Sequence, residues 1–239
     1  MINGKSILCV IPAREGSKGL PGKNTKELCG KPLVSWPIEA AKKSTLIDKI
    51  VVSTDSKIIS KIAQCYGASV PFIRPDKLAQ DTSTTFAVIE HAISFFKKQK
   101  QKFDYIICLE PTSPLTTDRD IDEALNMLEE NRNIADSIVG VSKVENAHPV
   151  FDARINKQGL ISPYQGNKFK FYRRQDIEEL YYFDGSLYIS DTNVFLEEKS
   201  FYHNKTLAYK VPKWKAIEID DIADFIYAEA ILNNINLMN

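Results

Sequence analysis

The chain has 239 residues, enough to bury one substantial core, so a single domain over residues 1–239 is expected. Its 31 lysines and arginines balance 31 aspartates and glutamates, which argues against bulk attraction to nucleic acid or to a membrane surface. The four cysteines are widely separated and form no C-x-x-C pair, which argues against a zinc site and a disulfide framework. A cytoplasmic protein is expected.

Short apolar runs alternate with segments of helical periodicity along the chain. Strands are predicted at residues 6–11, 49–54, 68–74, 104–110, 136–142, 186–190 and 215–219. Helices are predicted at residues 32–44, 56–66, 84–98, 120–130 and 220–235, and Pro37 indicates a late start or a kink in the first. Strands that alternate with helices of this length predict a three-layer α/β fold with a mostly parallel sheet.

The alternation stops after Val141. From there to about Tyr182 the sequence is polar, aromatic and irregular. We interpret residues 142–182 as an inserted hairpin or a dimerisation arm within the one domain, not as a second domain.

A basic, glycine-rich loop follows the first strand. This stretch, "IPAREGSKGLPGKN" at residues 11–24, carries Arg14, Lys18 and Lys23 among three glycines. Its spacing fits neither G-x-G-x-x-G nor the Walker loop. Ligands of open α/β sheets bind beyond the carboxyl ends of the strands, where glycines let backbone N–H groups face an anion. An anion site is therefore favoured over the alternative, a solvated basic loop.

Two carboxylates near the end of the chain form a second candidate. On the strand predicted for "IEID", Glu218 and Asp220 would point to the same face. Two carboxylates on one face repel each other unless a cation lies between them, and oxygen ligands suit magnesium. The competing interpretation is that Asp220 or Asp221 caps the final helix. Asp55 is likewise interpreted first as a helix cap.

Five motifs in order resemble the acylneuraminate cytidylyltransferases, the CMP-sialic acid synthetase family. They are "IPAREGSKGLPGKN", "VSTDS", "RPDKLAQDTSTT", "LEPTSPL" and "IEID", and the resemblance is weakest between about residues 146 and 182. It implies a Rossmann-like nucleotidyltransferase fold and a homodimer whose arm reaches into the neighbouring subunit's site. The implied reaction joins CTP to a nine-carbon 2-keto sugar acid and gives the CMP-sugar and pyrophosphate.

The resemblance also implies roles for individual residues. Arg14, Lys23 and Asp220 would be catalytic, and the nucleotide-binding residues would be Arg14, Lys18, Lys23, Asn24, Arg74 and Thr85. Lys18 either holds phosphate or only shapes the loop. Mg²⁺ would be bound by Asp220 and Glu218. The sugar-binding residues would be Glu110, Arg174, Gln175 and Tyr182.

Several positions depart from the family's pattern. Glu218 stands where an aspartate is usual, Glu110 where glutamine is common, and Tyr182 and Asp184 where some members have arginine and asparagine. The changes near the sugar position indicate a relative of sialic acid, such as a legionaminic acid. The alternatives are a Kdo or pseudaminic acid cytidylyltransferase, and a catalytically silent nucleotide-binding scaffold, which the change at Glu218 would favour.

Overall fold

A computed structural model of the protein describes residues 1–145, 147–166, 168–169 and 173–238, without the side chain of Arg174. Its main sheet has six strands in the order β10-β6-β9-β5-β1-β4. The strands are β1 (Ile7–Pro12), β4 (Lys49–Ser53), β5 (Tyr105–Cys108), β6 (Ser137–Lys143), β9 (Tyr181–Asp191) and β10 (Thr206–Lys210). Only β9 pairs antiparallel to its neighbours within this sheet, which confirms the mostly parallel prediction.

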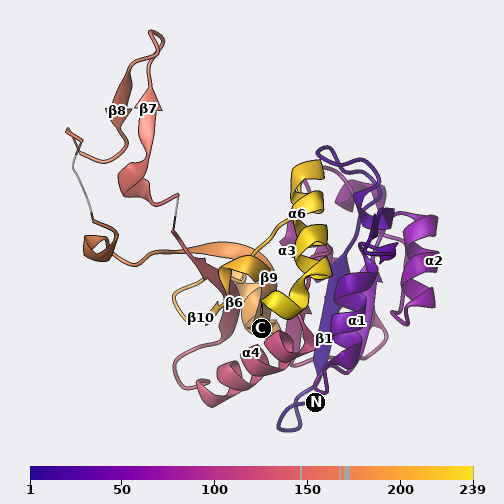
Figure 1. Cartoon of the computed structure of the whole chain (residues 1–239). Helices are drawn as coiled ribbons and strands as arrows, with labels where there is room; N and C mark the ends of the chain where they lie inside the picture. Colours follow the sequence, from indigo (N-terminus) through magenta and orange to yellow (C-terminus); the bar gives the residue numbers. More distant parts are fainter. Residues whose placement is uncertain (146, 167, 170–172, 239) are drawn as a thin grey trace.

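Helices cover both faces of the sheet (Figure 1). They are α1 (Ser35–Lys43), α2 (Lys57–Cys65), α3 (Thr85–Lys98), α4 (Asp118–Glu130), α5 (Thr192–Glu198) and α6 (Ile222–Asn233). Alternate residues of β1 separate the two cores: Cys9 packs in the cluster that includes α1, α2 and α4, while Leu8 packs in the cluster that includes α3 and α5. The three-layer prediction is therefore confirmed.

Pro37 marks a late start of the first helix, one of the two outcomes that the sequence left open. The helix α1 begins at Ser35 and not at Pro32, so Pro37 lies in its first turn. Backbone N–H groups in the first turn have no acceptor within the helix, so the missing donor of proline costs no hydrogen bond there.

Two predicted strands are wrong. Residues 68–74 form only one bridge to the sheet, between Ser69 and Val51, and Pro71 within them cannot donate to a ladder. Residues 215–219 join no sheet; a short 3₁₀ turn at Lys213–Lys215 leads into an extended segment. The predicted alternation nevertheless holds, since Ile217 and Ile219 are buried while Glu218 and Asp220 are exposed.

The region predicted as an arm begins within β6 and ends within β9. It contains a small hairpin of β7 (Ala153–Ile155) and β8 (Ile161–Pro163), which Figure 1 shows standing away from the main sheet. A second small hairpin, β2 (Glu27–Leu28) and β3 (Lys31–Pro32), leads into α1. The sequence did not predict β10 or α5. No helix in the described part of the chain is long and apolar enough to cross a membrane.

Candidate active site

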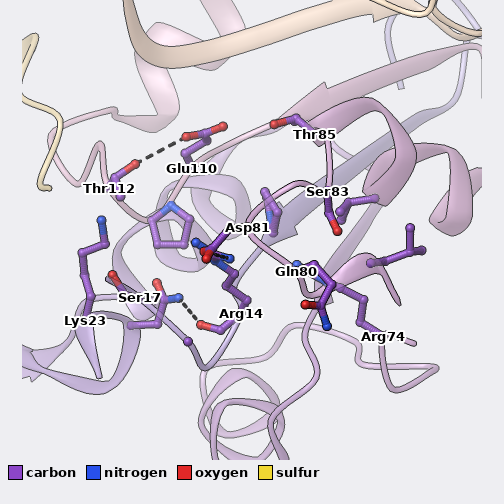
Figure 2. A pocket seen from close by; sticks show the side chains of 16 residues that line it. Arg14, Ser17, Lys23, Arg74, Gln80, Asp81, Ser83, Thr85, Glu110 and Thr112 are labelled. Carbon is purple, nitrogen blue, oxygen red and sulfur yellow. Dashed lines mark hydrogen bonds and ion pairs between the residues drawn. The ribbon is translucent and has the colours of Figure 1, made fainter. Parts of the chain in front are cut away.

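A cavity of about 300 Å³ lies where β1, β4 and β5 end (Figure 2). The parallel strands bring their carboxyl ends to the same edge of the sheet, where the loops after β1 and β5 and residues between 74 and 88 line the cavity. The cavity is lined by Pro12, Arg14, Gly16, Ser17, Lys23, Asn24, Arg74, Leu78, Gln80, Asp81, Ser83, Thr85, Val88, Glu110, Pro111 and Thr112. The set includes six of the residues singled out from the sequence: Arg14, Lys23, Asn24, Arg74, Thr85 and Glu110.

The loop at residues 11–24 is held in place by a contact from outside it and by a hydrogen bond within it. Its Glu15 N–H donates to Asp55 Oδ1 (2.9 Å), and Asn24 Nδ2 donates to the carbonyl oxygen of Arg14 (2.8 Å). The expected helix cap at Asp55 is therefore wrong: the N-cap of α2 is Ser56, and the carboxylate of Asp55 anchors the basic loop. Gly22 turns the chain with φ +68°, a conformation that disfavours any residue with a Cβ.

The beginning and the end of the chain meet beside this cavity. Lys23 Nζ donates to the carbonyl oxygen of Ile219 (2.6 Å) and lies 3.4 Å from Asp220 Oδ1. The N–H of Ile219 donates to the carbonyl oxygen of Thr112 (2.8 Å), which ties the same segment to the loop after β5. A Cβ on Gly19 would lie 2.3 Å from the backbone oxygen of Asp220, so only glycine fits there. The basic loop and the acidic segment thus form one wall.

The two aspartates at the start of α6 have different positions. Asp221 is the N-cap, and its side chain accepts from the N–H groups of Ala223 and Asp224. Asp220 precedes the cap and directs its carboxylate to Lys23. Asp221 therefore caps the helix, as one interpretation of the sequence expected, and the side chain of Asp220 is free of that role and faces Lys23.

Three carboxylates, those of Glu110, Glu218 and Asp220, influence one another's charge beside Lys23. Partial desolvation of the carboxylate by the protein around it, together with the neighbouring charge of Asp220, raises the pKa of Glu218. Burial and the charge of Glu218 raise the pKa of Glu110 to about 7. No group of three or more His, Cys, Asp or Glu side chains in the described residues could hold a metal alone. Mg²⁺ commonly binds to one or two carboxylates together with substrate phosphates, so Glu218 and Asp220 fit that ion.

Arg74 and Thr85 lie on the opposite side of the cavity from Lys23. Arg74 is only 4% exposed, and its side chain donates to the hydroxyl and the carbonyl oxygen of Ser53 at the end of β4. Burial lowers the pKa of this guanidinium to about 10. Thr85 is the first residue of α3, which Thr84 caps by accepting from the N–H of Ala87.

Asp81 forms ion pairs with two cations of the basic loop. Its Oδ1 lies 2.7 Å from Arg14 Nη1, and its Oδ2 lies 2.7 Å from Lys18 Nζ. Lys18 is directed to this carboxylate and does not line the cavity. Asp81 is part of the motif "RPDKLAQDTSTT", but sequence reasoning gave it no role. Its role could have been suspected from the sequence, because an acidic residue is unexpected in a motif that is otherwise suited to bind an anion.

The residues expected to bind the sugar do not share one cavity. Glu110 lines the main cavity, whereas Gln175 and Tyr182 line two other cavities near the base of the arm. The side chain of Arg174 lies outside the described part of the structure. Asp184 is 2% exposed, accepts from Ser142 Oγ (3.0 Å) and the N–H of Ser186 (3.0 Å), and so supports β9.

Comparison with known proteins identifies a family. A family model described as "Cytidylyltransferase" matches residues 8–236. The CMP-N,N'-diacetyllegionaminic acid synthase of Legionella pneumophila is 37% identical over 228 residues, which is 95% of this chain and 96% of that protein. The N-acylneuraminate cytidylyltransferase of Streptococcus agalactiae serotype V is 36% identical over 222 residues, 92% of this chain but 52% of that longer protein. The pseudaminic acid cytidylyltransferase of Campylobacter jejuni is 32% identical over 230 residues, 96% of this chain and 97% of that protein.

A solved structure supports the fold. The CMP:2-keto-3-deoxy-manno-octonic acid synthetase, solved in complex with CTP, matches with a TM-score of 0.71 over 96% of this chain and 99% of that chain. Its sequence is only 16% identical, so the similarity concerns the architecture. The Rossmann-like nucleotidyltransferase fold implied by the sequence is thereby confirmed.

Proposed function

Because this chain belongs to the cytidylyltransferase family, we propose that it transfers CMP from CTP to a nonulosonic acid and releases pyrophosphate. The observation that carries the proposal is that Arg14 and Lys23 line one cavity, and that Lys23 contacts Asp220, from the other end of the chain, beside that cavity. Cations and carboxylates beside one cavity suit a triphosphate and a divalent cation. By their names, one of the three relatives synthesises a CMP-linked legionaminic acid, and the other two are cytidylyltransferases of an acylneuraminate and of pseudaminic acid.

In the proposed reaction, the anomeric hydroxyl of the sugar acid attacks the α-phosphorus of CTP. Arg14 and Lys23 bind the phosphate oxygens and stabilise the charge that develops on them. Arg74 and Thr85 hold the cytidine on the opposite side of the cavity, and Asn24 fixes the backbone of the loop through Arg14. When bound by Asp220 and Glu218, Mg²⁺ would lower the pKa of the hydroxyl and neutralise phosphate charge. Lys18, which lies outside the cavity lining, would add positive charge near the phosphates.

The sugar half of the site would be completed by a second copy of the chain. The arm exposes Ile155 (73%) and Ile161 (63%), which are cross-strand partners at the end of its hairpin. Apolar side chains exposed together often mark an interface. We therefore propose a homodimer in which the arm of one subunit, with Arg174, Gln175 and Tyr182 near its base, contributes to sugar binding in the other.

Among sugar acids, a legionaminic-type acid is our first candidate. The match to the Legionella relative, which extends over 96% of that protein, favours it, as does Glu110, which lines the cavity where many family members carry glutamine. Asp184 gives no support, since its carboxylate is buried among Ser142 and Ser186. A pseudaminic acid remains the alternative, on the identity to the Campylobacter relative.

A pyrophosphate-release assay tests the proposal. Purified protein is incubated with CTP, Mg²⁺ and, in turn, a legionaminic, a neuraminic, a pseudaminic and an eight-carbon acid of the Kdo type. We expect turnover with the nine-carbon acids and the highest kcat/KM with the legionaminic acid. A higher kcat/KM with another acid would identify that acid, and not the legionaminic acid, as the preferred substrate. Absence of turnover with all four would support the silent nucleotide-binding scaffold.

A further inference from the structure

The carboxylate of Asp81 occupies the place between the two cations where a bound anion would be expected. Each of its oxygens contacts one cation at 2.7 Å, Arg14 on one side and Lys18 on the other. The two hydrogen-bonded cations lower the pKa of Asp81, so the group is ionised at neutral pH. Figure 2 shows Asp81 directed toward Arg14, and both residues line the cavity.

The loop that carries Asp81 is built to present this carboxylate. Within residues 75–84, Ala79 N–H donates to the carbonyl oxygen of Asp76 (3.0 Å), and Ser83 N–H donates to that of Gln80 (3.0 Å). Ser83 Oγ also donates to the carbonyl oxygen of Lys77 (3.0 Å). Apart from the ion pairs of Asp81, the contact with the basic loop is a longer hydrogen bond, from Arg14 Nη1 to the carbonyl oxygen of Ala79 (3.4 Å). The 75–84 loop therefore keeps its shape largely through its own bonds.

We propose that Asp81 is a positioning residue: its carboxylate holds Arg14 and Lys18 in the arrangement that receives the phosphates of CTP, and it is exchanged for those phosphates when the nucleotide binds. This inference rests on the proposed function. Without an anion between them, two neighbouring cations repel each other, and their long side chains would lose the arrangement that the phosphates need. Preorganised cations bind and stabilise developing charge without being rearranged during the reaction.

The exposure of the ion pairs suits an exchangeable contact. The side chain of Asp81 is 43% exposed and that of Lys18 is 82% exposed. Exposed ion pairs of this kind contribute little to stability. A triphosphate brings several negative charges and more acceptor oxygens than one carboxylate, so it displaces Asp81 at small cost. Lys23 is held by other groups, Asp220 and the backbone of Ile219.

The test compares Asp81→Asn and Asp81→Glu with a control from the same loop, Asp76→Asn. Binding of inorganic pyrophosphate is measured by calorimetry, which requires no turnover, and CTP kinetics are measured alongside. In Asp81→Asn the competing charge is gone but the side chain keeps its shape. We expect pyrophosphate to bind about three- to fivefold more tightly, the fold-change that matches the strength of an exposed ion pair. We also expect a lower KM for CTP together with a kcat reduced about fivefold, because the cations are less well positioned.

The outcomes separate the possibilities. Asp81→Glu, which keeps the charge, should restore kcat toward the wild-type value, and Asp76→Asn should change neither pyrophosphate binding nor kinetics. Weaker binding of pyrophosphate and CTP in Asp81→Asn would overturn the proposal, since it would mean that Asp81 only braces the loop or contacts the ligand itself. If the wild-type protein showed no turnover at all, the proposed function would fail, while the pyrophosphate measurement would still decide the role of Asp81.

Discussion

The wall beside the cavity and the projecting arm differ in how many contacts they make with the rest of the same chain. In the wall, the basic loop is fixed by Asp55, by Asn24 and by the backbone of Ile219, which lies almost 200 residues further along the chain. In the arm, the β7–β8 hairpin packs mainly on itself and leaves Ile155 and Ile161 exposed. The difference is what we expect if, as proposed above, one chain builds the nucleotide half of the site and a second copy completes the sugar half.

The most severe test of the wall is Asp220→Asn. We expect it to abolish turnover, a loss on the order of a thousandfold, because an amide has no charge to hold a divalent cation opposite the phosphates. CTP binding, measured by calorimetry, should largely survive, since Arg14, Lys23 and Arg74 remain. The matched control is Asp221→Asn, because asparagine also caps helices well and this residue faces α6. Full activity in Asp220→Asn would remove Asp220 from the metal site.

The contact between the two ends of the chain can be tested with the loop glycines. A methyl group on Gly19 would collide with the backbone of Asp220, while one on Gly16 would meet nothing within 4 Å. We expect Gly19→Ala to lower kcat/KM by roughly 10- to 100-fold, because a displacement of about 1 Å can cost that much. Gly16→Ala should stay within about threefold of wild type. Equal effects in the two variants would mean that the contact at Gly19 does not position the acidic segment.

Substitutions in the arm should act through dimer formation and leave nucleotide binding unchanged. An added charge in Ile155→Asp or Ile161→Asp should weaken the dimer at least about tenfold, as measured by sedimentation across concentrations. Turnover should fall about as far at low protein concentration, with CTP affinity within twofold of wild type. Gln158→Asp, which adds the same charge at the exposed turn of the hairpin, is the control. Unchanged assembly in both isoleucine variants would argue that the arm does not make the interface.

The last prediction concerns the pH dependence of stability. The pKa of Glu110 is raised from its ordinary value of 4.5 to about 7, so the folded protein binds this proton more tightly than the unfolded chain does. Its stabilising contribution is full below pH 4.5 and is lost as the pH rises toward 7.

Without Mg²⁺ or CTP, Glu110→Gln should therefore unfold like wild type at pH 4.5 and be more stable at pH 8, by at most about 3 kcal/mol. Denaturant titrations measure this, with the exposed Glu197→Gln as control. If the unfolding free energies of Glu110→Gln and wild type differed equally at both pH values, the raised pKa of Glu110 would be contradicted.

Most of the sheet and helices could be predicted from the sequence because buried parallel strands are short apolar runs and their helices carry an apolar stripe. The segment at 215–219 shows the limit. Its alternation of apolar and acidic residues correctly separated Ile217 and Ile219 from Glu218 and Asp220, but alternation reports burial and not hydrogen-bonded pairing. The strand β10 was missed because the run "TLAYK" at an edge of the sheet is half exposed and gives a weak pattern.

At the site, the basic loop predicted an anion site with Arg14 and Lys23, and the family resemblance added Arg74; all three line the one cavity. Their partners could not be predicted. The carboxylate of Asp55 looked like a helix cap because it directly precedes α2, yet it turns back to the basic loop. The pairing of Asp81 with Arg14 and Lys18 joins residues more than 60 positions apart, and no local pattern encodes such a distance.

The central claim is that this one cavity binds CTP and brings a nonulosonic acid to its α-phosphorus. The most direct measurement is the mass of the product after incubation of the protein with CTP, Mg²⁺ and an equimolar mixture of nine-carbon sugar acids. We predict a CMP-linked sugar acid, formed first from the legionaminic-type acid, together with one pyrophosphate for each product. Unchanged CTP and unmodified acids after prolonged incubation would contradict it.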